Sequence, residues 1–146
     1  AVARHFGSDI IVVIGHGLTF WSEIGRLDTP AQRKTVFRPD GEQMGYQPPN
    51  GPVVEEGVMP KLLRRYPNLY GELSDASVAL GRDPAYGPKF LTEFQDRLLF
   101  GTDFCNVTAP FPTLELLLAW RKSGKIGEPV FRKIARENAA RLFHLT

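Results

Sequence analysis

Apolar residues along the chain form short runs that end in polar residues or glycine. The clearest run covers residues 10–14 and consists of five β-branched residues, and shorter strand-like segments follow at residues 68–73 and 97–102. A strand of a parallel sheet is covered on both faces, so its sequence is a short apolar run with little alternation. The pattern therefore predicts three buried parallel strands.

Between and after these runs, apolar residues recur at the spacing of an α-helix. Helices are expected at residues 18–24, 53–66, 85–96, 113–122 and 128–143, and residues 1–9 resemble the end of a helix cut inside the element. The last predicted helix has a core-facing stripe made of Val130, Phe131, Ile134, Ala135, Asn138 and Leu142.

The segment 53–66 has distinct signals at both ends. Glu55 and Glu56 fall in its predicted first turn and Arg64 and Arg65 in its last, an arrangement that complements the helix dipole. Its predicted apolar face comprises Val54, Val58, Leu62 and Leu63.

Residues 25–52 lack any periodicity and are rich in proline and glycine. A loop of this length inside a compact domain is usually a lid, a binding loop or a disordered insertion. We therefore expect it to lie over a pocket, with Tyr46 packed within it.

The order of elements is strand, helix, strand, helix, strand and then helices, which predicts an α/β domain over residues 1–146 with right-handed crossovers. Periodicity leaves open whether the sheet is open or part of a barrel. In both architectures ligands bind at the carboxyl ends of the strands. His16, Ser74 and Asp103 follow the three predicted strands, so we expect them at one rim.

Two of these residues are the main candidates for a functional site. His16 stands between Gly15 and Gly17, which permit a tight turn and close approach of another group. Asp103 follows an apolar run directly, and a carboxylate in such surroundings requires a partner or a cation. The alternative for Asp103 is a cap of the following turn or helix. His5 and His144 are expected to be surface residues.

Composition narrows the function further. The chain has 18 Lys+Arg and 16 Asp+Glu, and its basic residues are scattered, so neither nucleic acid nor an anionic membrane is an expected partner. Cys105 is the single cysteine, which excludes an intrachain disulfide and favours a reducing, cytoplasmic compartment. No apolar run approaches the ~20 residues of a membrane span. The expected partner is a small-molecule substrate.

Five motifs occur in order along nearly the whole chain: VIGHG at 13–17, FWSEI at 20–24, YPNLYGELS at 66–74, LFGTD at 99–103 and IARENAARL at 134–142. Together they resemble the C-terminal half of the amidohydrolase superfamily, in the branch of TIM-barrel metal-dependent hydrolases that also includes aromatic-acid decarboxylases.

The resemblance implies a partial (β/α)₈ TIM barrel with a divalent metal, zinc by preference, at the carboxyl end. On this basis His16 matches the histidine after the sixth strand, which contacts the metal or activates water and substrate. Asp103 matches the eighth-strand aspartate that binds the metal and moves a proton. Water activated by the metal would be the nucleophile, and Asp103 would accept its proton. Ser74 matches no ligand of the family.

The chain also departs from the family pattern. The His-x-His pair of the first strand and the fifth-strand histidine have no counterpart, and a whole barrel needs about 250 residues. The chain is thus expected to be a fragment of a longer enzyme or a half-barrel completed by association. The expected activity of the parent is hydrolysis of a C–N or C–O bond; non-oxidative decarboxylation and a catalytically inert fragment are the alternatives. A basic residue near the rim, Arg26 or Arg38, would favour the decarboxylase.

The expected strand edges at residues 10–14 and 98–102 are apolar. Unpaired apolar edges recruit another chain or are covered, here by the long loop 25–52. A homo-oligomer is therefore expected.

Overall fold

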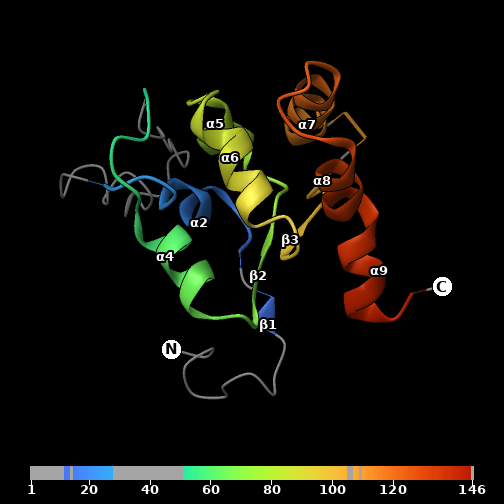
Figure 1. Ribbon diagram of the computed structural model, residues 1–146. Helices are drawn as coiled ribbons and strands as arrows, with labels where there is room; N and C mark the ends of the chain where they lie inside the picture. Colours follow the sequence, from blue (N-terminus) through green and yellow to red (C-terminus); the bar gives the residue numbers. More distant parts are fainter. Residues whose placement is uncertain (1–11, 14, 28–50, 105–106, 109, 146) are drawn as a thin grey trace.

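The computed structural model describes residues 12–13, 15–27, 51–104, 107–108 and 110–145, and these form a mixed α/β structure (Figure 1). Its sheet has the order β1-β2-β3, with β1 (Val12–Val13), β2 (Leu69–Glu72) and β3 (Leu98–Leu99) all parallel. The three predicted parallel strands are confirmed, and β2 and β3 are shorter than the segments predicted for them.

Helices surround this sheet, with α2 and α4 on one side of Figure 1 and the C-terminal helices on the other. They are α2 (Leu18–Ser22), α4 (Val58–Arg65), α5 (Ser77–Gly81), α6 (Tyr86–Glu93), α7 (Pro112–Lys122), α8 (Glu128–Arg132), the π-helical segment η1 (Lys133–Glu137) and α9 (Asn138–Phe143). Every predicted helix from residue 18 onward has a counterpart. The short helix α5 was not predicted, because five residues carry too little periodicity to be recognised.

The start of the predicted helix 53–66 is wrong. Residues 53–57 are not helical, and Glu56 forms an antiparallel bridge with Gly25, so both glutamates precede α4 instead of occupying its first turn. Their partners are arginines: Glu55 accepts a hydrogen bond from Arg26, and Glu56 from Arg64. Ion pairing thus explains these carboxylates better than the helix dipole does.

The predicted apolar face of this helix is also largely wrong. The buried residues of α4 are Met59, Pro60 and Leu63, whereas Val54 is 92% exposed and Val58 55% exposed. Val58 and Leu62 lie within α4 and are still exposed, so the buried stripe is one residue out of phase with most of the predicted one.

An aromatic cluster packs one face of the sheet. Trp21 is fully buried and meets Phe90 edge to face with ring centroids 6.2 Å apart, and Phe94 lies 4.8 Å beyond Phe90. Gly71 of β2 leaves the space for Trp21, because a Cβ at position 71 would lie 2.9 Å from the indole ring. A glycine within a strand here marks the close approach of a large side chain.

The pleat of β2 divides its residues between two faces. Leu69, Gly71 and Leu73 are buried towards the helices, while Tyr70 and Glu72 alternate with them and are half-buried. Glu72 therefore projects to the face opposite the aromatic core.

The C-terminal helices cover the outer side of β3. The carbonyl of Ile134, within η1, accepts a hydrogen bond from the Phe100 N–H at 3.0 Å. The buried amide of Asn138 donates to the carbonyls of Gln95 and Leu98 at 2.6 and 2.8 Å. Of the predicted stripe, Val130, Ile134 and Asn138 are buried, Phe131, like Leu142, is partly buried, and Ala135 is exposed.

Several predictions lie outside the described residues. These are the helix end at residues 1–9, most of the loop 25–52, His5, Arg38, Tyr46 and Cys105. His144 is described and is exposed at the end of α9, as expected. In the part of the chain that is described, no helix is both long and apolar enough to cross a membrane.

Candidate functional site

The turns after β1 and β3 bring His16 and Asp103 together at one end of the sheet. The distance from His16 Nε2 to Asp103 Oδ2 is 3.6 Å, and Ser74, just after β2, places its Oγ 3.3 Å from His16 Nδ1. The three predicted candidates therefore meet at one rim. Their meeting follows from parallel pairing of the three strands, which points all their carboxyl ends the same way.

Glu72, at the end of β2, is the residue that joins this group. Its Oε2 lies 3.1 Å from His16 Nδ1 and accepts a hydrogen bond from the Ser74 hydroxyl at 2.7 Å. Its Oε1 accepts the Ser74 backbone N–H at 2.8 Å. The Glu72 carboxylate is thus held by Ser74, two residues further along the chain, and faces His16, from the turn after β1.

The charge around His16 is predominantly negative. The hydrogen bond with Glu72 is the largest cause of a His16 pKa above its ordinary 6.5, and the charges of Asp103 and Asp75 act in the same direction. Partial burial opposes them. Asp75 itself has a raised carboxyl pKa, because of its burial first and the nearby charge of Asp103 second. The rim therefore favours a positive charge.

Asp103 adopts a backbone conformation that is uncommon for side-chain-bearing residues. Its φ is 46°, in the left-handed region, where Asp and Asn are the non-glycine residues found most often. The following helix α7 begins at Pro112 with Phe111 at its N-cap and no side-chain cap hydrogen bond. Asp103 therefore does not cap α7, and its carboxylate is directed to His16 instead.

Ser74, His16 and Asp103 superficially resemble the set used by serine hydrolases. Ser74, however, is only 6% exposed, and its hydroxyl proton is donated to Glu72 at 2.7 Å, which is shorter than its 3.3 Å distance to His16. Its carbonyl accepts a hydrogen bond from Thr113 Oγ1. Ser74 is therefore a structural support of the rim and not a nucleophile.

Two donors of this rim fit a divalent metal. Zinc binds imidazole nitrogen at about 2.0–2.1 Å and carboxylate oxygen at about 2.0–2.2 Å, so two ligands of one tetrahedral ion stand roughly 3.4 Å apart. The 3.6 Å between His16 Nε2 and Asp103 Oδ2 is close to that spacing, and Glu72 at Nδ1 is the carboxylate partner that metal-bound histidines usually have. Among the described residues, however, no group of three or more His, Cys, Asp or Glu side chains could hold a metal ion.

Sequence reasoning missed Glu72 and Asp75. A usable signal was present, because residues two apart in a strand share a face, and Glu72 is two residues before the singled-out Ser74. A charged residue next to the end of a predicted buried strand is a site candidate for the same reason as Asp103, because a buried charge needs a partner.

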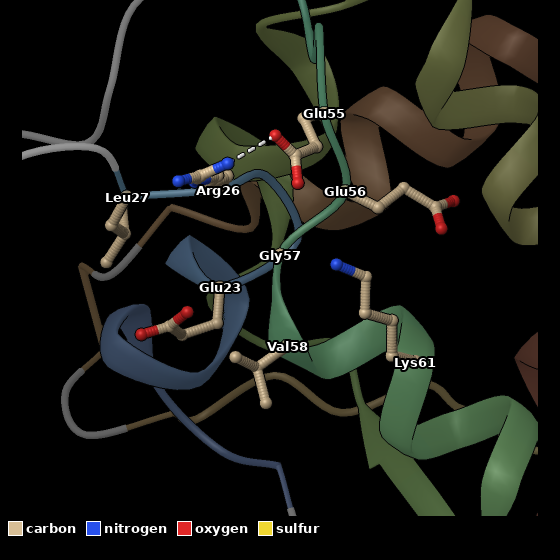
Figure 2. A pocket seen from close by; sticks show the side chains of 8 residues that line it. All are labelled: Glu23, Arg26, Leu27, Glu55, Glu56, Gly57, Val58 and Lys61. Carbon is tan, nitrogen blue, oxygen red and sulfur yellow. Dashed lines mark hydrogen bonds and ion pairs between the residues drawn. The ribbon is translucent and has the colours of Figure 1, made fainter.

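A separate pocket of about 440 Å³ lies beside α2 and the start of α4 (Figure 2). Glu23, Arg26, Glu55 and Lys61 contribute charged groups to its lining, which includes neither His16 nor Asp103. Arg26 donates to Glu55 there at 2.7 Å. Arg26, one of the two arginines expected to favour a decarboxylase, is thus engaged at a different place, and the other, Arg38, lies outside the described residues.

Comparison with known proteins supports the resemblance. The model of the family described as Amidohydrolase matches residues 50–145, a range that contains Glu72, Ser74 and Asp103 but begins after His16. Searches of curated proteins and of solved structures returned no match. Because the family match covers well over half of the 146 residues, the chain belongs to the amidohydrolase family.

Proposed function

We propose that this chain supplies part of the active site of a metal-dependent hydrolase, with His16 and Asp103 as two ligands of one divalent ion, zinc by preference. The observation that carries the proposal is the 3.6 Å approach of His16 Nε2 to the Asp103 carboxylate, with Glu72 placed at Nδ1. The family match supports the hydrolase class. The remaining ligands would come from outside the described residues, in a longer protein with a complete (β/α)₈ barrel.

The roles of the two residues follow from their chemistry. A bound divalent ion supplies Lewis acidity and makes water acidic enough to attack near neutral pH. Asp103, 40% exposed at the rim, is placed to accept a proton from the attacking water and return it to the leaving group. His16 would bind the ion through Nε2, because its Nδ1 faces Glu72. The substrate class is a small cyclic or carboxylated compound with a C–N or C–O bond to break.

Metal binding tests the proposal directly. In a longer form of the protein that carries the remaining ligands, we expect calorimetric titration with zinc alone to show one site per chain, and His16→Asn and Asp103→Asn each to weaken zinc binding at least tenfold. In the 146-residue chain alone we expect no stoichiometric zinc. The matched control is Asp96→Asn, because Asp96 precedes β3, at the opposite end of the strand, and pairs with Lys133.

Two results of the metal titration would contradict the proposal. A longer form that unfolds cooperatively but binds neither zinc nor manganese would remove the metal role, and a site unaffected by both Asn variants would show that other residues hold the ion.

For a form of the protein that turns over, release of carbon dioxide distinguishes the decarboxylase from the hydrolase. We expect hydrolysis products without carbon dioxide, since Arg26 is paired with Glu55 in a pocket that excludes His16.

A further inference from the structure

Every polar group of Glu72 has a partner, and the partners come from three different parts of the rim. Its backbone N–H donates to the Gly15 carbonyl at 2.9 Å, and its carbonyl accepts from the Trp21 indole at 2.8 Å. Its carboxylate accepts hydrogen bonds from the backbone N–H and the hydroxyl of Ser74 and faces His16 Nδ1. The side chain is 22% exposed, whereas that of His16 is 61% exposed. Glu72 is therefore anchored, and His16 is the more exposed of the pair.

We propose that Glu72 is a positioning residue that keeps the proton of neutral His16 on Nδ1, and so directs the lone pair of Nε2 towards Asp103. This deepens the proposed function and rests on it for the role of His16, while the tautomer itself does not depend on a metal. An ionised carboxylate only accepts hydrogen bonds, so the 3.1 Å contact with Nδ1 is favourable only if Nδ1 carries the proton.

The Ser74 hydroxyl strengthens this assignment. It has one proton, which goes to Glu72 Oε2 at 2.7 Å, and its oxygen is then left as an acceptor 3.3 Å from His16 Nδ1. Both atoms that face Nδ1 are therefore acceptors. Nε2 also faces an acceptor, Asp103 Oδ2, but that oxygen is farther away, at 3.6 Å, than the two acceptors at Nδ1, at 3.1 and 3.3 Å. The single proton of the neutral ring is therefore better satisfied on Nδ1.

Gly101 completes the support from the third strand. A Cβ at this position would overlap Oε1 of Glu72, so the absence of a side chain is what admits the carboxylate. The position that Glu72 occupies is bounded by Ser74 on one side and the Gly101 backbone on the other. Each of the three strand ends thus contributes one residue to this arrangement: His16 follows β1, Glu72 ends β2 and Gly101 follows β3.

The test measures the tautomer of His16 in the metal-free protein by ¹⁵N NMR of labelled histidine. The chain has three histidines, and His16→Asn identifies the His16 signals. At a pH where the ring is neutral, we expect Nδ1 to appear as the protonated nitrogen and Nε2 as the unprotonated one. A predominant Nε2–H form, or a rapidly exchanging mixture, in the unmodified protein would overturn the proposal without any variant of Glu72.

Glu72→Gln provides a second, shape-conserving test. The amide oxygen can still accept the Ser74 N–H, which turns the amide nitrogen towards His16 Nδ1 as a donor. We expect the proton to move to Nε2 and the zinc affinity of the longer form to fall ~10- to 100-fold, the range for lost carboxylate partners of metal-bound histidines. Glu93→Gln, an exposed partner of Arg64, is the matched control and leaves both readouts unchanged.

These outcomes separate the two proposals. An Nδ1–H tautomer that moves in Glu72→Gln, in a longer form that binds no zinc, sustains the positioning role and removes the metal role. An unchanged tautomer in a folded Glu72→Gln protein removes the positioning role whatever zinc does.

Discussion

The backbone of Gly101 runs so close to the Glu72 carboxylate that a Cβ at position 101 would overlap Oε1 and crowd Cδ. Gly101→Ala should therefore displace Glu72 and lower the free energy of unfolding by about 1–3 kcal/mol, as overpacking typically does. Thermal or urea unfolding measures this loss.

The control for this substitution is Gly81→Ala, because a Cβ there meets only Leu116, at an ordinary 3.7 Å. It should be neutral or stabilising by up to ~1 kcal/mol, since alanine is the better helix former. In a Glu72→Ala background the cost of Gly101→Ala should shrink, because the group it displaces is gone. An equal cost in both backgrounds would mean that Glu72 is not the reason for the glycine.

Substitution of His16 or Asp103 by Asn should separate function from stability. Both side chains are exposed at strand ends, and Asn tolerates the left-handed backbone of Asp103, so folding should be nearly unchanged. In a catalytically active form, turnover should fall by ~10²-fold or more. A melting curve and an assay on the same preparation measure both quantities.

If Asp103 instead caps its local turn, Asp103→Asn retains turnover and loses on the order of 1 kcal/mol of stability. Normal turnover in an early-melting variant would falsify the site assignment.

Asp83 should give the protein a pH-dependent contribution to stability. It is buried, and the hydrogen bonds from the backbone N–H groups of Tyr86 and Val53 lower its carboxyl pKa below 3.8. A lowered carboxyl pKa means that the stabilisation is complete well above pH 3.8 and is lost as the pH falls through the folded-state pKa. Asp83→Asn turns an amide donor towards one of these N–H groups and should cost about 1–3 kcal/mol near neutral pH.

Urea unfolding of both proteins between pH 7 and pH 2 measures this difference, which should narrow towards the acidic end. The control is the exposed Asp96→Asn, for which we expect a change within about 0.5 kcal/mol. A difference between wild type and Asp83→Asn that is constant over the pH range would contradict the role of the charge.

Association is the prediction that concerns the whole sheet. Among the residues that the structure describes, the order β1-β2-β3 makes β1 and β3 the outer strands, and η1 already covers β3 through the Phe100–Ile134 hydrogen bond. We therefore expect a dimer or larger assembly that uses the β1 edge, since an unpaired strand edge is a template for another chain. Sedimentation velocity over a micromolar dilution series measures the mass, and a monomer throughout would contradict the expectation.

Local sequence was sufficient for the elements themselves. Short apolar runs located the parallel strands, and helical spacing located α7 and the C-terminal helices, because both signals depend only on neighbours within a few residues. The same reasoning placed the start of the 53–66 helix too early. Glu55 and Glu56 were assigned to the first helical turn from their position in the sequence. Folding instead brings them to Arg26 and Arg64, with which they pair.

The sequence by itself determined three parallel strands with His16, Ser74 and Asp103 after their ends, and so predicted that these residues would meet. Only the tertiary structure decided that Glu72 lies between these residues and links them. Glu72 joins His16 to Ser74, and Gly101 leaves it room, because the register of β2 against β3 pairs Glu72 with Leu99 and brings the Gly101 backbone alongside the carboxylate. Register between strands depends on packing across the whole sheet, so it cannot be read from the sequence of a single strand.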